Sequence, residues 1–297
     1  MTFPSWLGGL PNLRILSLRS NKLHSLIKDS RANNSFDQIQ VIDPPSNGFS
    51  GKLPVSLFEN FQAIKIIGEN SGSQEYVAEA YSEFYTNALI VIAKGLELEL
   101  PQVLTTYMII DLSRNRFEGH IPNIIGDLVR LRTLNLSYNV LEGINELNDT
   151  FPGWLGGLPD LHILSLRSNK LHVHRKHSRL DNLFAKIQVI DLSSNEFNGN
   201  LPANLFENFQ AMKIIGGNSG TRERVADAYS DFYTNALIVT AKGLELELPR
   251  VLTTYMIINF SRNRFEGHIP NIIGDLVELR TLNLFHNGLE GIIPASL

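Results

Sequence analysis

The side chains that could carry out chemistry are few and poorly spaced for it. The densest group is "HVHRKH" at residues 172–177, whose imidazoles could ligate a metal, but no acidic or cysteine partner lies nearby. A solvated loop is the favoured interpretation of this segment. "GENSG" (68–72) and "GGNSG" (216–220) lack the G-x-S-x-G spacing of a nucleophile elbow. No phosphate-binding or dinucleotide motif occurs, so we expect no enzyme, no cofactor and no metal site.

The composition excludes several further kinds of function, and binding of another molecule is the function that is left. The 297 residues contain no cysteine, which excludes disulfides and thiolate nucleophiles. A net charge of −4 without a dense Lys/Arg run argues against nucleic acid as a partner. The apolar run at residues 88–93 is far shorter than the roughly 20 residues of a membrane-spanning helix, and residues 1–20 lack the pattern of a signal segment. We therefore expect this chain neither to insert into a membrane nor to carry its own leader.

The sequence is a tandem duplication. A shift of 148 residues aligns Phe3 with Phe151 and Gly143 with Gly291 without a gap, and about three-quarters of the paired positions are identical. This predicts two units, residues 1–144 and residues 145–297.

Each copy contains a finer repeat. "LRILSLRSNKL" (13–23), "YMIIDLSRNRFEGHIP" (107–122) and "LRTLNLSYNVLEG" (131–143) share the frame L-x-x-L-x-L-x-x-N. In a short strand, Leu16 and Leu18 would point inward while Ser17 and Arg19 face solvent. Asn21, at the turn after the strand, could satisfy backbone groups of neighbouring turns with its amide. One such coil cannot bury its apolar side alone, so the coils must stack.

This frame resembles the leucine-rich repeat, and the trailing G-x-I-P resembles the plant-type version. The resemblance implies an α/β solenoid with a parallel concave β-sheet, in which a small island insert interrupts each half.

The spacing of the asparagines departs from the repeat in two ways. Asn139 and Asn145 are only 6 residues apart, too few to complete a coil, since they span at most about 20 Å when extended. We therefore expect a register break near residues 140–148, with two half-solenoids that stack imperfectly or not at all. Asn47 and Asn115 are 68 residues apart, which leaves about 44 residues beyond a normal repeat.

The excess predicts island inserts at about residues 60–107 and 208–255. "EYVAEAYSEFY" (75–85) has apolar residues at helical spacing. "ALIVIA" and "LELEL" then predict a hairpin that turns at Lys94 and Gly95 and packs on the solenoid.

The inserts also carry a motif: a tyrosine, eight residues, then Lys-Gly. It resembles the island domain of plant leucine-rich-repeat receptor-like proteins, and the flanking repeats resemble the C-terminal repeats of fungal-resistance receptors. The resemblance implies a location at the extracellular face of the plasma membrane and contacts with a protein or peptide ligand and a co-receptor kinase ectodomain. The matching residues, which we predict to bind a partner, are Tyr85, Lys94, Gly95, Tyr233, Lys242 and Gly243. A purely structural role in the hairpin is the favoured alternative for them.

Further candidates lie on the strands. Surfaces of this kind usually bind proteins, and arginine forms directional pairs with carboxylates, although a solvated face is the alternative for any single residue. The predicted contacts of the concave strand face are Ser17, Arg19, Asp111, Ser113, Ser165 and Arg167. The glycosylation candidates, each in an N-x-S/T sequon, are Asn33, Asn135, Asn148 and Asn259.

Together these features predict a protein-recognition module of a cell-surface receptor-like protein in plant defence, which binds without catalysis. Two alternatives remain open at this point. The chain could be a soluble inhibitor-like repeat protein that binds a secreted pathogen enzyme, or a recombinant fragment without a settled activity.

Overall fold

The protein is described by a computed structural model in which two compact units are distinguished. The repeat unit comprises Met1–Ile67, Met108–Ile215 and Met256–Leu297, and the insert unit comprises Gly68–Tyr107 and Gly216–Tyr255. The residues that the structure describes are 3–27, 36–65, 89–93, 96–100, 108–143, 155, 157–172, 184–213, 238–241, 244–247 and 256–296.

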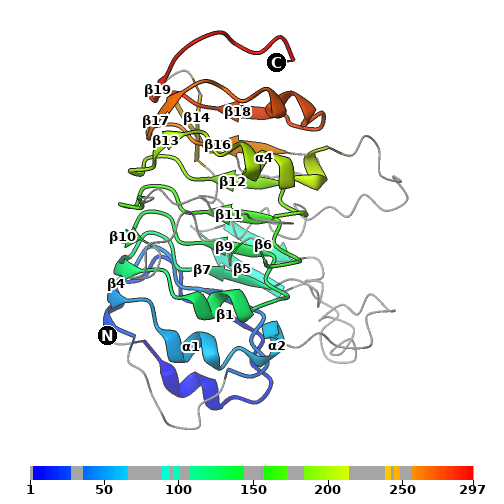
Figure 1. Ribbon diagram of the computed structural model, residues 1–297. Helices are drawn as coiled ribbons and strands as arrows, with labels where there is room; N and C mark the ends of the chain where they lie inside the picture. Colours follow the sequence, from blue (N-terminus) through cyan, green and yellow to red (C-terminus); the bar gives the residue numbers. More distant parts are fainter. Residues whose placement is uncertain are drawn as a thin grey trace. The chain divides into compact units, whose positions relative to one another are not determined.

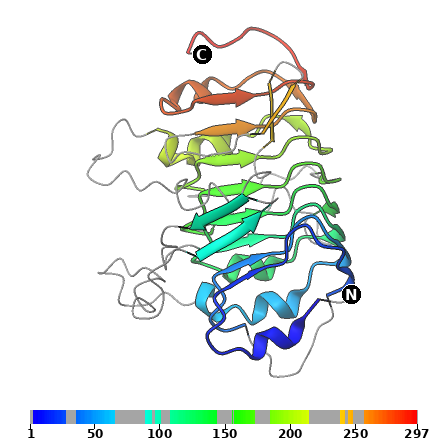
Figure 2. The same cartoon turned by 180° about the vertical axis from the view of Figure 1, so that it is seen from behind.

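The main sheet of the repeat unit has eight parallel strands in the order β1-β3-β7-β9-β11-β12-β16-β18. Successive strands lie side by side along the stack, and the N-terminal and C-terminal coils lie at its opposite ends (Figures 1 and 2). The strands are β1 (Ile15–Ser17), β3 (Val41–Asp43), β7 (Ile109–Asp111), β9 (Thr133–Asn135), β11 (Ile163–Ser165), β12 (Val189–Asp191), β16 (Ile257–Asn259) and β18 (Thr281–Asn283).

Shorter strands and helical turns complete each coil. One four-stranded sheet has the order β10-β8-β4-β2 and one three-stranded sheet the order β13-β17-β19. Their strands are β2 (His24–Leu26), β4 (Gly48–Lys52), β8 (Arg116–His120), β10 (Val140–Gly143), β13 (Asn198–Asn200), β17 (Arg264–Gly267) and β19 (Gly288–Leu289). The helical segments are η1 (Ser5–Gly9), α1 (Val55–Glu59), α2 (Gln62–Lys65), η3 (Asn123–Asp127), α4 (Ala203–Asn208), η4 (Gln210–Met212) and η5 (Asn271–Asp275).

A ladder of asparagines joins each coil to the next. The amide nitrogen of Asn115, for example, donates to the carbonyl of Pro44 in the preceding coil and to two carbonyls of its own coil. Its amide oxygen accepts the backbone N–H of Phe49. The same pattern of bonds recurs from coil to coil, so each side chain ties two coils together. The rungs are Asn47, Asn115, Asn139, Asn169, Asn195, Asn263 and Asn287.

The ladder shows that the expected register break is wrong. Strand β9 of the first copy pairs in parallel with β11 of the second, with Leu134 opposite Leu164. Asn169, not Asn145, is the rung after Asn139, and its amide reaches the carbonyl of Leu136 at 3.0 Å. The interval from Asn139 to Asn169 is 30 residues, which is enough for a complete coil. The two copies therefore form one continuous sheet.

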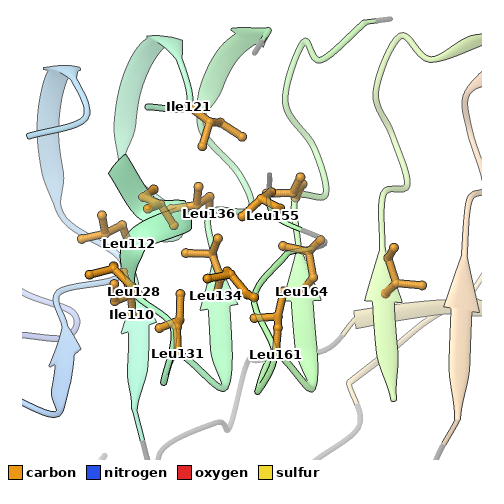
Figure 3. Close-up of a cluster of buried hydrophobic side chains, with 14 of the residues drawn as sticks. Ile110, Leu112, Ile121, Leu128, Leu131, Leu134, Leu136, Leu155, Leu161 and Leu164 are labelled. Atoms are coloured by element: carbon orange, nitrogen blue, oxygen red, sulfur yellow. The ribbon is translucent and has the colours of Figure 1, made fainter. Parts of the chain in front are cut away.

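The core confirms this continuity. Leu134 and Leu136 from the first copy are fully buried in the same cluster as Leu155, Leu161 and Leu164 from the second. Figure 3 shows these side chains pointing into one interior between neighbouring coils. Because burial of apolar area is the main stabilising term, the joint contributes to the core like any other pair of coils.

The inserts form hairpins, as predicted. β5 (Leu89–Ala93) pairs antiparallel with β6 (Leu96–Leu100), and β14 (Ile238–Ala241) pairs with β15 (Leu244–Glu247). The predicted helix at 75–85 lies outside the described residues. The insert unit begins at Gly68 and Gly216, later than the expected 60 and 208.

The later start of the insert unit has a simple physical cause. Phe61 and Ile64 follow the expected boundary at residue 60, yet both are fully buried in the core of the repeat unit. Their burial keeps α2 with the repeats.

Candidate binding site

The face of the main sheet that points away from the core carries a row of polar side chains, which we call the strand face. The last residues of the eight strands form this row: Ser17, Asp43, Asp111, Asn135, Ser165, Asp191, Asn259 and Asn283. A second row lies two residues further along each chain and includes Arg19, Ser113, Ser137 and Arg167. Because the sheet crosses the duplication joint, both copies contribute to one surface.

The strand face is less exposed than its sequence pattern predicted. Ser17 is exposed and Arg19 is half-buried, but Asp111, Ser113, Ser165 and Arg167 are each 5% exposed or less. These four residues, which the sequence placed on the concave strand face as contacts, are therefore buried and do not face solvent. Parallel strands place side chains of neighbouring coils close together, so polar groups on this face bond to one another.

The first polar cluster joins three strands. Arg19 donates from Nε and Nη2 to the two carboxylate oxygens of Asp43, at 3.2 and 2.9 Å, which is a bidentate pair. Ser17 Oγ donates to the same carboxylate at 3.1 Å. Asp111 lies further along the row, with its Oδ2 3.9 Å from Arg19 Nη2. One guanidinium thus faces two carboxylates.

This arrangement affects both acids. The pKa of Asp111 is raised from 3.8 to about 6, first by burial and then by the charge of Asp43, while hydrogen bonds from Ser113 and the charge of Arg19 oppose the rise. Burial likewise raises the pKa of Asp43, against the lowering effects of Arg19 and Ser17. The cluster therefore changes its charge in mildly acidic solution.

The second copy contains a related cluster in which one acid is absent. Asp191, equivalent to Asp43, accepts hydrogen bonds from Ser193 Oγ at 2.6 Å and Ser193 N at 2.9 Å. Burial raises the pKa of Asp191, while Ser193, the charge of Arg167 and the amide of Asn259 lower it. Asn259 stands where the first copy has Asp111, so the two clusters differ by one carboxylate.

A third group, which the sequence did not reveal, lies at the joint. The guanidinium carbons of Arg114 and Arg167 lie 4.8 and 5.5 Å from the ring centroid of Tyr138. Both distances are within the range of cation–π attraction. We call these three residues the tyrosine cluster. Tyrosine and arginine are the residue types that most often dominate protein–protein binding energy.

The backbone of Tyr138 has a left-handed conformation. Tyr138 has a φ of 55°, in the left-handed region, as do the other residues that directly precede a ladder asparagine. A bulky side chain is uncommon there. Half of the other positions that precede a ladder asparagine hold serine and none holds an aliphatic residue or a second tyrosine, so the tyrosine was a signal available in the sequence. The equivalent residue of the second copy is His286.

Two of the four sequons lie on the strand face. Asn135 accepts hydrogen bonds from Ser137 N and Oγ, and Asn259 accepts the same pair from Ser261. Both asparagines are buried, so a glycan could be attached only after these bonds break. Asn33 and Asn148 lie outside the described residues.

The island motif residues likewise lie outside the described part of the chain. These are Tyr85, Lys94, Gly95, Tyr233, Lys242 and Gly243. Their predicted role in partner binding stays a prediction. The six-residue histidine segment, apart from His172, is also outside the description.

Stacked coils, a parallel sheet and an asparagine ladder define a leucine-rich-repeat solenoid. The family model for the leucine-rich repeat matches residues 108–128 and 278–297. Receptor-like protein 35 of Arabidopsis thaliana is 31% identical over 290 residues, covering 93% of this chain and 29% of that protein.

Solved structures show the same fold. A TDR receptor aligns with a TM-score of 0.58 at 19% identity, covering 99% of this chain and 38% of that one. The ectodomain of the Arabidopsis thaliana receptor kinase GASSHO1/SCHENGEN3, solved with CASPARIAN STRIP INTEGRITY FACTOR 2, aligns with a TM-score of 0.54 at 20% identity, covering 99% and 27%.

Along 93% of its length the chain is similar to the leucine-rich-repeat receptor-like proteins of plants. It spans less than a third of the length of the receptor-like proteins it matches. Within the described residues, no helix has both the length and the apolar character needed to cross a bilayer.

Proposed function

We propose that the chain is a protein-recognition module of a plant cell-surface receptor-like protein, and that it acts in defence signalling. The observation that carries this proposal is the single strand face formed by both copies. The strand face runs across eight parallel strands from both copies, so one partner can lie along all of them. The similarity to receptor-like proteins supports the location at the extracellular face of the plasma membrane.

The tyrosine cluster is the proposed anchor of this surface. Tyr138 and Arg114 are half-buried, so a partner can cover them, while the buried Arg167 has its guanidinium carbon 5.5 Å from the centroid of the same ring. A half-buried tyrosine held between two guanidinium groups loses little side-chain entropy on binding. The exposed Ser17 would supply a directional hydrogen bond, and the island motif residues are a separate proposed contact.

The proposed partner is a protein or peptide ligand, or a co-receptor kinase ectodomain. To test a co-receptor as the partner, the probe is the ectodomain of SERK1, which is the co-receptor in a solved complex of the receptor kinase HAESA. Purified chain is titrated with this ectodomain by biolayer interferometry. Binding is then compared between the unmodified chain and Tyr138→His, which gives the first copy the residue of the second. His286→Ala is the matched control, because it changes the equivalent position of the second copy.

The proposal predicts measurable binding that Tyr138→His weakens by at least tenfold and His286→Ala leaves unchanged. Loss of one interface tyrosine that anchors binding typically costs about 2 kcal/mol or more, which is more than a tenfold change. Equal effects of the two substitutions would exclude the tyrosine cluster as the anchor. Inhibition of a secreted wall-degrading hydrolase without capture of the ectodomain would contradict the receptor proposal.

A further inference from the structure

Three Asn-Gly pairs occur in the chain, and they begin at Asn47, Asn198 and Asn287. Asparagine followed by glycine is prone to form a cyclic imide, because glycine has no Cβ to hinder attack of its backbone nitrogen on the asparagine side chain. The three pairs have different surroundings in the structure. Asn47 and Asn287 are rungs of the asparagine ladder, whereas Asn198 lies in β13.

The side-chain amides of the two rungs are held in place. Asn47 Nδ2 donates to three carbonyls, of which that of Leu18 lies nearest at 2.8 Å, and its Oδ1 accepts the N–H of Leu23 at 3.1 Å. Asn287 Nδ2 donates to two carbonyls, and its Oδ1 accepts the N–H of Phe265. Neither side chain can turn towards the following glycine until these hydrogen bonds break.

The glycines that follow the rungs are held as well. Gly48 N donates to Leu23 O at 2.7 Å, so the nitrogen that would attack already has a partner. A Cβ built at Gly48 would lie 3.2 Å from Leu23 O, and one built at Gly288 would lie 3.3 Å from Phe265 O. The backbone of the neighbouring coil therefore leaves little room for a ring at either rung.

Asn198 differs from the rungs in each of these respects. Its side chain is exposed, and in the part of the chain that the structure describes its amide makes no hydrogen bond. A Cβ built at Gly199 would meet no atom within 4 Å. Strand β13 has three residues and, among the described strands, pairs only with β17, so it can open locally at little cost.

From this comparison we infer that Asn198–Gly199 is a site of spontaneous deamidation in the folded protein, and that the ladder protects the other two pairs. The backbone nitrogen of Gly199 attacks Cγ of Asn198. A bond forms between this nitrogen and Cγ, the bond from Cγ to Nδ2 breaks, and ammonia leaves with the proton of the Gly199 N–H. Water, the only co-reactant, then opens the imide at one of its two carbonyls and gives aspartate or isoaspartate at position 198.

The modification would change the charge and the strand pairing at one place. Asn198 is the register partner of Arg264, whose Nη2 lies 3.5 Å from Glu196 Oε2. Aspartate adds a second carboxylate on the strand next to this guanidinium. Isoaspartate also adds a methylene group to the backbone of β13, which moves the following residues out of register with β17. The ladder itself stays unchanged.

Hydroxylamine tests the inference directly, because it cleaves a chain at the cyclic imide of an Asn-Gly pair. The folded chain is incubated with hydroxylamine, and mass spectrometry identifies the fragments. Cleavage should give residues 1–198 and 199–297. Cleavage after Asn47 and Asn287 should be at least about tenfold slower, because their hydrogen bonds must break first. In guanidinium chloride, which unfolds the ladder, all three pairs should be cleaved at similar rates.

Two variants identify the residue that reacts. Asn198→Gln should abolish cleavage of the folded chain, because glutamine forms its larger ring far more slowly. Asn200→Gln is the matched control, since Asn200 is exposed in the same strand but precedes Leu201, and it should leave the cleavage unchanged. Peptide mapping of folded chain stored without hydroxylamine should find aspartate and isoaspartate at position 198 and asparagine at 47 and 287.

Two results would overturn the inference. One is a folded chain that stays intact at Asn198 while the unfolded chain is cleaved there. The other is equal cleavage of the three pairs in the folded chain, which would show that the ladder gives no protection. Circular dichroism during the reaction confirms that the chain is folded.

Discussion

Substitution of Asp111 by asparagine should stabilise the protein at neutral pH. Asp111 is 2% exposed and shares the single Arg19 with Asp43. Asparagine keeps an oxygen that can accept the N–H of Ser113, as Asn259 does for Ser261 in the second copy. The substitution removes the buried charge without removing the bond.

The magnitude follows from the pKa of Asp111. Burial, and then the charge of Asp43, raise this pKa from 3.8 to about 6. Between these two values the folded chain binds more protons than the unfolded chain, so the free energy of unfolding falls as the pH rises. The stabilisation by the protonated acid is complete below about pH 4 and is lost as the pH passes through 6. The loss by pH 8 corresponds to about 3 kcal/mol.

Urea titrations at pH 4 and at pH 8 measure the effect as a change in the free energy of unfolding. Asp111→Asn should match the unmodified chain at pH 4 and exceed its stability by up to about 3 kcal/mol at pH 8. The reverse substitution, Asn259→Asp, adds a carboxylate beside the buried Asp191 and should lower stability at pH 8 only. An Asp111→Asn variant that is not more stable at pH 8, or whose effect is independent of pH, would refute this account of the cluster.

Further predictions concern the ladder, the prolines and the surface charges, and each is measured by urea titration. Asn169→Ala removes buried hydrogen bonds to three carbonyls and one N–H, and should lower the free energy of unfolding by about 2–4 kcal/mol. Asn21→Ala removes only exposed hydrogen bonds, and should lower it by less than about 1 kcal/mol. Equal costs would contradict the ladder as the tie between coils. Pro44→Leu combined with Pro45→Ser restores two backbone N–H groups, which donate hydrogen bonds at Leu192 and Ser193 in the second copy. The double substitution should raise the free energy of unfolding by about 1–3 kcal/mol. A lower free energy of unfolding would show that the fold accommodates the prolines. Arg264→Ala breaks an exposed ion pair and should change stability by less than about 0.5 kcal/mol, so a larger loss would indicate a contact other than this pair.

The coils and the hairpins could be predicted from the sequence because their signals are local. The alternation around Leu16, the asparagine after each strand and the Lys-Gly pair between two apolar runs are all sequence signals that lie within about ten residues. Gly119 also belongs to this class, since its φ of 74° requires the glycine of the G-x-I-P turn. These features depend on backbone conformation and strand periodicity rather than on distant partners.

The joint was predicted wrongly because an asparagine alone is not a rung. Asn145 has the residue type but no preceding L-x-L strand, whereas Asn169 follows the strand Ile163–Ser165. A rung needs its amide to reach the carbonyl of the previous coil, and only stacking decides which asparagine does so. The whole L-x-x-L-x-L-x-x-N frame, and not the asparagine alone, predicts a ladder rung.

The burial of the strand face could not be predicted from the sequence either. Ser165 and Arg167 alternate with leucines, which indicates only that they point away from the core. Their exposure depends on side chains of other coils, as the approach of Arg167 to Tyr138 shows. The sequon at Asn135 does not indicate an exposed asparagine for the same reason. It specifies three consecutive residues and contains no information about the side chains that pack around them.

Hydrogen exchange at the duplication joint tests the continuity of the repeat unit most directly. The backbone N–H groups of Leu136, Tyr138, His162 and Ile163 donate across the joint. If the sheet is continuous, these amides exchange as slowly as the equivalent donors between β12 and β16, and they lose protection in the same unfolding event. Fast exchange confined to the joint, with slow exchange on either side, would show two separately stable halves and contradict the account.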